Sequence, residues 1–100
     1  MDIKTAVIYR LNDLIKQKDI TVNEAAVRSG VPPSTLKNIL YGQSRNAGVV
    51  TIKKICDGLD ITIQEFFEDP IFADLEPELY EQANNLRIQI LQDGFFMGKG

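Results

Sequence analysis

The segment GVPPSTLKNILYG, residues 30–42, limits where a helix can begin more than any other part of the sequence, because it contains two adjacent prolines. Pro33 suits the first position of a helix, where the N–H that proline lacks would have no partner. Pro32 disfavours helical geometry at Val31, the residue before it. We therefore predict a short helix that begins at Pro33.

This predicted helix has an apolar side and a polar side. At about 100° per residue, Leu36, Ile39 and Leu40 fall on one side and are expected in the core. The opposite side carries Ser34, Lys37, Asn38 and Tyr41. Such a side can approach a grooved partner closely, and its donors and acceptors suit base edges and phosphates. The alternative interpretation of the same pattern is a solvated surface.

Two helices are predicted before this one from apolar residues at helical spacing. The first is expected over residues 3–17, with Asp2 as its N-cap. The second begins at the capping-box pattern of Thr21 and Glu24, and Gly30 can end it in the left-handed conformation. Two more helices are predicted after a polar loop, and nothing in residues 3–68 alternates as a strand does. The sequence therefore predicts an all-α domain.

The two later helices also have recognisable starts. Thr51 is placed to cap the fourth helix. The apolar residues of that helix at helical spacing are Ile52, Ile55, Cys56 and Leu59. Thr62 and Glu65 form a second capping box, and Pro70 stops the fifth helix.

Composition narrows the possible functions. The chain has 100 residues with one cysteine and no histidine, so metal-centre and hydrolase chemistry are poorly supported and we expect no enzyme and no cofactor. Cys56 can be a buried apolar side chain or a redox sensor, and we favour burial. No segment resembles a secretory signal or a membrane span, so a soluble cytoplasmic protein without membrane contact is expected.

The charge of the chain is uneven. Residues 1–68 carry nine basic and eight acidic side chains, whereas residues 69–100 carry two basic and six acidic ones. We therefore divide the chain into a domain over residues 1–68 and an acidic C-terminal extension over residues 69–100. A sixth helix is expected to start near Pro77, with apolar residues at positions 79, 83, 86 and 90. It can form a dimer contact or fold back on its own domain, and we favour the dimer.

The second helix, the turn at Gly30 and the sharply started third helix form a helix-turn-helix arrangement, in which the second element of the pair is presented to the major groove of DNA. Internal contacts of such a pair can come from Ala25, Ala26, Val31, Leu36 and Ile39. Residues 21–67, which include VPPSTLKNILYGQSRN followed by TIKKICDGLDITIQEFF, resemble the Xre/Cro-type helix-turn-helix domain of bacterial and phage regulators. The resemblance implies the five-helix, lambda-repressor-like fold.

The resemblance also implies DNA contacts. In this family the third helix reads bases, and the loop after it and the start of the second helix contact phosphates. For this chain that implies roles for Ser34, Thr35, Lys37, Asn38, Gln43, Ser44, Arg45 and Asn46. Tyr41 can bond a phosphate or pack over the loop, and both alternatives stay open.

Three positions depart from the family pattern. Pro33 replaces a polar base reader, so its contact with DNA would have to be apolar, for instance with a thymine methyl group. Val22 replaces a phosphate-binding residue and leaves Thr21 or Asn23 as substitutes. Ser29 replaces an apolar residue, so we expect looser packing at the end of the second helix.

We therefore expect a sequence-specific DNA-binding transcriptional regulator, and a repressor in particular, that binds double-stranded DNA as a homodimer without a small-molecule ligand. The third helix would enter the major groove of an operator half-site. The alternative is a protein-interaction module of the same fold, such as an antitoxin component, whose acidic extension engages a basic partner.

Overall fold

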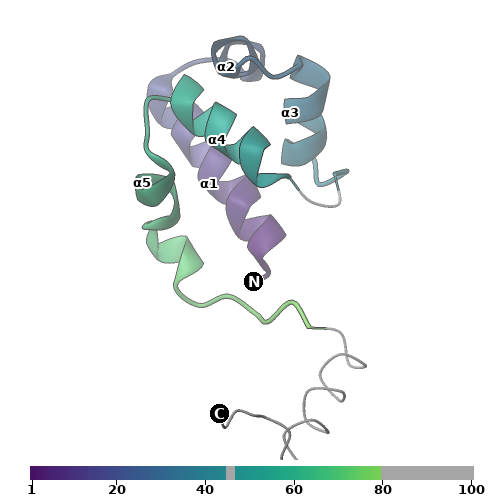
Figure 1. Ribbon diagram of the computed structural model, residues 1–100, viewed down its shortest axis with the longest axis vertical. Helices are drawn as coiled ribbons and strands as arrows, with labels where there is room; N and C mark the ends of the chain where they lie inside the picture. Colours follow the sequence, from purple (N-terminus) through teal and green to yellow (C-terminus); the bar gives the residue numbers. More distant parts are fainter. Residues whose placement is uncertain (45–46, 80–100) are drawn as a thin grey trace, which may run out of the picture.

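The computed structural model describes residues 1–44 and 47–79, and this part of the chain is entirely helical apart from its connections. Five α-helices and a short 3₁₀ helix follow one another (Figure 1): α1 Ile3–Lys18, α2 Val22–Ser29, α3 Pro33–Leu40, α4 Val49–Gly58, α5 Ile63–Phe67 and η1 Pro70–Phe72. The prediction of an all-α, lambda-repressor-like fold with five helices is confirmed.

Side-chain caps fix the starts of α1, α2 and α5 as the sequence predicts. The Asp2 carboxylate accepts a hydrogen bond from the Thr5 backbone N–H at 2.8 Å. Thr21 and Thr62 each form a complete capping box with the glutamate three residues later. These caps satisfy N–H groups that have no partner within the helix.

The start of α4 differs from the prediction. Thr51 does not cap this helix, because α4 begins two residues earlier at Val49, after Gly48. Gly48 has the extended conformation of an N-cap residue but no side chain that could accept a hydrogen bond. The prediction was wrong because it placed the cap at the first residue with a hydroxyl group, and two exposed valines had obscured the helical pattern.

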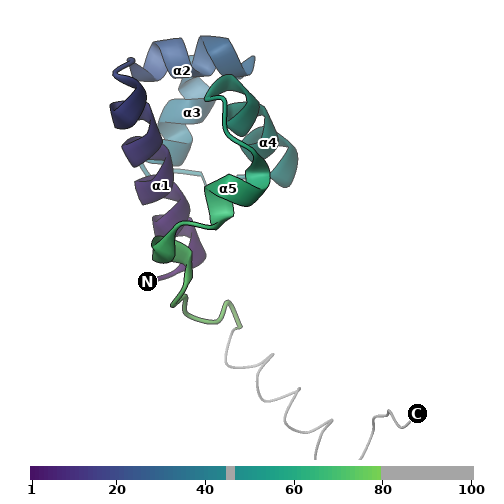
Figure 2. The same ribbon diagram turned by 90° about the vertical axis from the view of Figure 1, so that its left-hand side faces the viewer.

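Figure 2 shows α1, α2, α3 and α4 around a common interior, with α5 between α1 and α4. The core side chains come mainly from these helices, and Phe66 of α5 is fully buried among them. Ala25 and Ala26 are fully buried, and α2 packs closely along α4. Cys56 is also fully buried, which confirms that it is an apolar core residue. Its burial raises the pKa of the thiol and keeps it uncharged.

The expectation of looser packing at Ser29 is wrong. Ser29 is buried, and its hydroxyl group donates a 2.7 Å hydrogen bond to the Ala25 carbonyl one turn earlier. A Cβ atom on Gly58 would come within 2.7 Å of the Ser29 Cα and backbone nitrogen. The small serine and the glycine therefore allow the ends of α2 and α4 to touch, where a larger apolar side chain would hold them apart.

The segment after α5 continues along α1. Asp69 caps η1 by accepting a hydrogen bond from the Ile71 N–H at 2.9 Å, and Phe72 packs against the core. The Met1 amino group forms a 3.1 Å ion pair with Glu76. Residues 77–79 have no regular structure, and the rest of the predicted sixth helix lies outside the described residues. The domain division after residue 68 stays a prediction.

Candidate nucleic-acid interface

The turn between α2 and α3 is built from one glycine and two prolines. Gly30 ends α2 in the left-handed conformation, with φ 65°, and the Val31 N–H then donates to the Ala26 carbonyl at 3.0 Å. Pro33 is the first residue of α3, as predicted. The Pro32 carbonyl accepts from the Thr35 and Leu36 N–H groups at 2.9 and 3.2 Å. The direction of α3 relative to α2 is therefore set by backbone hydrogen bonds on both sides of the turn.

The two sides of α3 have the burial that the sequence predicts. Leu36, Ile39 and Leu40 are buried in the core. The residues with exposed side chains are Pro33, Ser34, Lys37, Asn38 and Tyr41, and Thr35 is half-buried. We call these five exposed residues the outer face of α3. Tyr41 is 71% exposed, so it does not pack over the described part of the following loop.

The loop after α3 is tied to the helix and to α1. The Asn38 carbonyl accepts from the N–H groups of Gln43 and Ser44 at 2.9 and 3.2 Å. Gly42 has a φ of 75°, which favours glycine, and its carbonyl accepts a 2.8 Å hydrogen bond from Lys4 Nζ. Gln43 is exposed and Ser44 half-buried, directly beyond the outer face of α3.

Arg45 and Asn46, the remaining predicted residues of this loop, lie outside the described residues. Their predicted phosphate contacts therefore stay predictions.

The start of α2 holds the other predicted phosphate contacts. Thr21 and Asn23 are exposed, while Val22 is partly buried against the core. The Thr21 hydroxyl oxygen accepts from the Glu24 N–H at 3.0 Å, and the Thr21 side chain also interacts with the Glu24 carboxylate, so it is engaged in the capping box. Hydrogen bonds from Thr21, first its backbone N–H, hold the pKa of the Glu24 carboxyl below its usual range. Glu24 is therefore a negative charge that weakens phosphate binding at this helix start.

Comparison with known proteins agrees with this geometry. Residues 11–66 match the family model described as helix-turn-helix. The chain belongs to that family, as the Xre/Cro resemblance predicts. It is also similar to a solved structure, the crystal structure of the prophage Lp1 protein 11, with 30% sequence identity and a TM-score of 0.65 over 75% of this chain and 100% of that chain. No curated protein matches the chain.

Membership of the helix-turn-helix family makes the chain a DNA-binding regulatory protein. Among the helices that the structure describes, none is long and apolar enough to cross a membrane. The described residues also contain no group of three histidine, cysteine or acidic side chains that could hold a metal ion.

The helix-turn-helix region has a charge pattern that motif analysis alone missed. No acidic residue occurs between Glu24 and Asp57. The same stretch contains five basic residues, which are Arg28, Lys37, Arg45, Lys53 and Lys54. Counting charge in windows shorter than a domain would have found it, since the total over residues 1–68 hides it. The stretch covers most of α2, all of α3 and most of α4.

Several basic side chains of the domain are already engaged. Lys18 forms a 3.8 Å ion pair with Asp60, and Lys53 pairs with Asp57. Lys4 and Arg10 bind backbone carbonyls of other elements. The side chain of Lys37 forms no ion pair or hydrogen bond with any described residue. Its ammonium group is therefore available to a ligand on the outer face of α3.

Proposed function

We propose that this protein is a sequence-specific transcriptional repressor that inserts α3 into the major groove of an operator half-site. The observation that carries the proposal is the outer face of α3, which is polar, exposed and located in a stretch of 32 residues, 25–56, without an acidic side chain. A negative charge on that surface would repel the phosphates that flank a groove. None is contributed by the helix that would enter it.

The side chains of the outer face have the chemistry that base recognition needs. Asn38 can donate and accept in a bidentate contact with adenine, and Lys37 can reach guanine or a phosphate. Ser34 can bond to several bases, and Pro33 can pack against a thymine methyl group. Thr35 is half-buried, so its hydroxyl group would contact DNA at the edge of the outer face of α3 and not at its centre.

Besides Lys37, phosphate contacts would come from the flanks of α3. Gln43 and Ser44 follow the helix directly, and Arg45 and Asn46 continue the same loop. Thr21 and Asn23 at the start of α2 complete the set. These contacts position the domain on DNA and carry no sequence information themselves.

We propose a homodimer, because helix-turn-helix regulators read two half-sites separated by about one helical turn of DNA or a multiple of it. Repression follows if the dimer occupies a site that overlaps a promoter. The protein would act in the cytoplasm, where the DNA of a bacterium or of its phage is accessible.

Selection from random duplexes tests the proposal. We expect enrichment of a motif with two-fold symmetry, and a reporter gene placed behind that motif should be repressed when the full chain is present. Asn38→Ala should relax the preference at one position of each half-site and cost about 1 to 3 kcal/mol of binding free energy. Gln64→Ala is the matched control, because Gln64 is an exposed amide on α5. Failure to enrich any motif at low salt would overturn the proposal.

The alternative of a protein-interaction module has one observation in its favour. Residues 57–79 contain eight acidic and no basic side chains, which is a surface that a basic protein could bind. If no DNA motif is enriched, the full chain should instead bind a basic partner in a salt-sensitive manner. Substitutions of exposed acidic residues such as Glu68→Gln and Asp74→Asn should then weaken that binding, whereas Asn38→Ala should leave it unchanged.

A further inference from the structure

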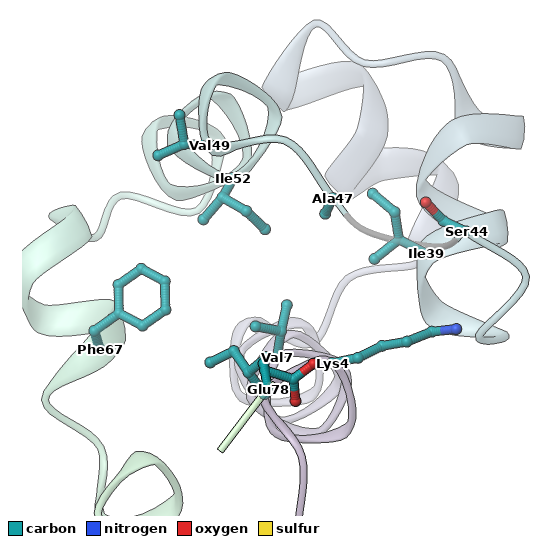
Figure 3. A pocket seen from close by; sticks show the side chains of 10 residues that line it. Lys4, Val7, Ile39, Ser44, Ala47, Val49, Ile52, Phe67 and Glu78 are labelled. Atoms are coloured by element: carbon teal, nitrogen blue, oxygen red, sulfur yellow. The ribbon is translucent and has the colours of Figure 1, made fainter. Parts of the chain in front are cut away.

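An apolar groove of about 810 Å³ opens between α1, α5 and the start of α4. Its apolar lining comes from five elements that face one another (Figure 3): Val7 of α1, Ile39 of α3, Ala47 of the loop, Val49 and Ile52 of α4, and Phe67 of α5. Val49 and Phe67 are 71% and 41% exposed. The groove therefore leaves apolar surface in contact with water, which favours an apolar occupant.

Three of the ten residues that line the groove are polar, and two of these three are engaged within the protein. Lys4 extends from α1 toward the loop after α3 and donates to the Gly42 carbonyl. Ser44 has an interaction of its own. Glu78 is the only acidic residue among those that line the groove. A charged ligand would therefore find little complementary charge in this groove.

The chain itself arrives at this groove. The segment that follows η1 passes the start of α1, where the Glu76 N–H donates to the Met1 carbonyl at 3.1 Å and the Glu76 carboxylate pairs with the Met1 amino group. Two residues later Glu78 lines the groove, and Leu79 is 47% exposed. The last described residue thus lies beside the rim of the groove, with 21 residues still to follow.

The composition of those 21 residues suits an occupant of the apolar groove. They contain a run of apolar residues at helical spacing and end with two phenylalanines and a methionine: Leu86, Ile88, Ile90, Leu91, Phe95, Phe96 and Met97. Their charges, Glu81 and Asp93 against Arg87 and Lys99, cancel. A segment tethered at the rim of a groove has an effective concentration in the millimolar range, so even a weak apolar contact is populated within one chain.

We propose that residues 80–100 dock in the groove of their own chain, with their apolar side chains against Val49 and Phe67, rather than forming the dimer contact that the sequence analysis favours. The groove also includes Ser44 and Ala47, which flank positions 45 and 46 of the loop after α3. Docking would therefore contact the described residues on either side of this loop, where phosphate contacts are proposed. Any effect of this contact on DNA binding rests on the proposed function, whereas the docking itself does not.

Paramagnetic relaxation in the full chain tests the docking. Val50→Cys places a spin label beside the groove, since Val50 is 65% exposed and adjacent to Val49. Val27→Cys, on the exposed side of α2, is the matched control with a 75% exposed valine. Cys56 is fully buried and is not expected to react with the label. In ¹⁵N-labelled protein, amides of residues 86–97 should broaden with the label at position 50 and not at position 27.

A mixed sample separates the possible occupants. Protein at natural isotopic abundance that carries the spin label is mixed with ¹⁵N-labelled protein that has no spin label. Only contacts between two chains can then broaden the observed signals. We expect no broadening of residues 86–97 in that sample. Broadening there, or equal broadening from positions 50 and 27, would overturn docking within the chain, and the first result would identify a second copy as the occupant.

A charge in the groove gives a second measurement. Val49→Glu should increase the amide exchange rates of residues 86–97 at least tenfold, whereas Val27→Glu should leave them unchanged. Both positions are exposed, so both variants should fold. These experiments contain no DNA, and their outcome is therefore independent of whether the selection experiment enriches a motif. Equal exchange rates in both variants would contradict the docking.

Discussion

Residues 25–56 and residues 57–79 are neighbours in the sequence but have opposite charge. The first stretch has five basic and no acidic side chains, and the second has eight acidic and no basic ones. The structure also separates α3 from α5, which lie on opposite sides of the domain in Figure 1; in Figure 2, α5 lies in front and α3 behind. A polyanion is therefore attracted to one side and repelled from the other. The net charge of −3 does not show this uneven distribution of charge.

Helix α1 contacts both stretches, and it does so through one basic side chain in each case. Lys4 donates to the Gly42 carbonyl just after α3. Arg10 donates to the Glu65 and Phe66 carbonyls at 2.9 Å and pairs with Asp69 at 3.2 Å. Both cations meet carbonyl groups at or just beyond the C-terminal end of a helix, where the helix dipole favours positive charge. Basic residues of a DNA-binding domain thus need not all face DNA.

The contact between the two stretches at Gly58 gives the largest expected effect. Gly58→Ala should lower the free energy of unfolding by about 3 kcal/mol, because the new Cβ would clash with the Ser29 backbone, which cannot rotate away. Urea denaturation measures the change. Gly48→Ala is the control, since a Cβ there meets nothing within 4 Å. Equal stability of the two variants would show that α2 and α4 can move apart without cost.

The contacts of Arg10 with the acidic stretch should contribute more to the free energy of unfolding than the contact of Lys4 with the basic stretch. Arg10→Met should cost about 2 kcal/mol, because it leaves two carbonyls and Asp69 without a charged partner at a site where the Arg10 side chain is only 11% exposed. Lys4→Met removes one hydrogen bond and should cost about 1 kcal/mol. Lys16→Met, an exposed cation of the same helix, should be neutral in the same urea titration. The opposite order of Arg10 and Lys4 would contradict this comparison.

The location of a cation should decide its effect on DNA binding. Lys37→Gln should reduce the slope of log affinity against log salt by about one, because the outer face of α3 loses one phosphate contact. Lys16→Gln makes the same chemical change on α1 and should leave the slope unchanged. Binding to the selected duplex at several salt concentrations measures both. Equal slopes for the two variants would mean that Lys37 contacts a base or nothing.

Acid should produce the smallest effect, through Glu24 just before the first stretch and Glu65 within the second. Hydrogen bonds from Thr21 and Thr62 lower the pKa values of Glu24 and Glu65 relative to their ordinary value of 4.5. A lowered pKa in the folded state means that the capping boxes stabilise the fold above that value and lose this contribution as the pH falls below it. The thermal midpoint should therefore decrease between about pH 5 and pH 3.

Glutamine variants identify the source of that decrease. Glu24→Gln and Glu65→Gln keep a side chain that fits a capping box but cannot ionise. Each variant should show a smaller decrease of the thermal midpoint with acid than the unmodified chain. An unchanged pH dependence in the double variant would assign it to other carboxyl groups, such as Asp2, whose pKa a hydrogen bond from Thr5 also lowers.

Prediction from the sequence succeeded where the determinants are local. The starts of α1, α2, α3 and α5 follow from one to four consecutive residues each, and the apolar side of α3 follows from its own spacing. It failed at Thr51, because the start of α4 has neither a side-chain cap nor a proline to mark it. It also failed at Ser29, where the packing depends on Gly58 twenty-nine positions away.

By itself the sequence determined the helices, the family and the polar side of α3, since capping boxes, prolines and apolar spacing act within one or two turns of the chain. Only the tertiary structure decided which cations are free. Lys4 and Arg10 look like surface charges in the sequence, yet they reach carbonyls 38 and 56 positions away, whereas Lys37 stays unpaired among the described residues. Hydrogen bonds over such distances depend on how helices pack, and no local pattern encodes them.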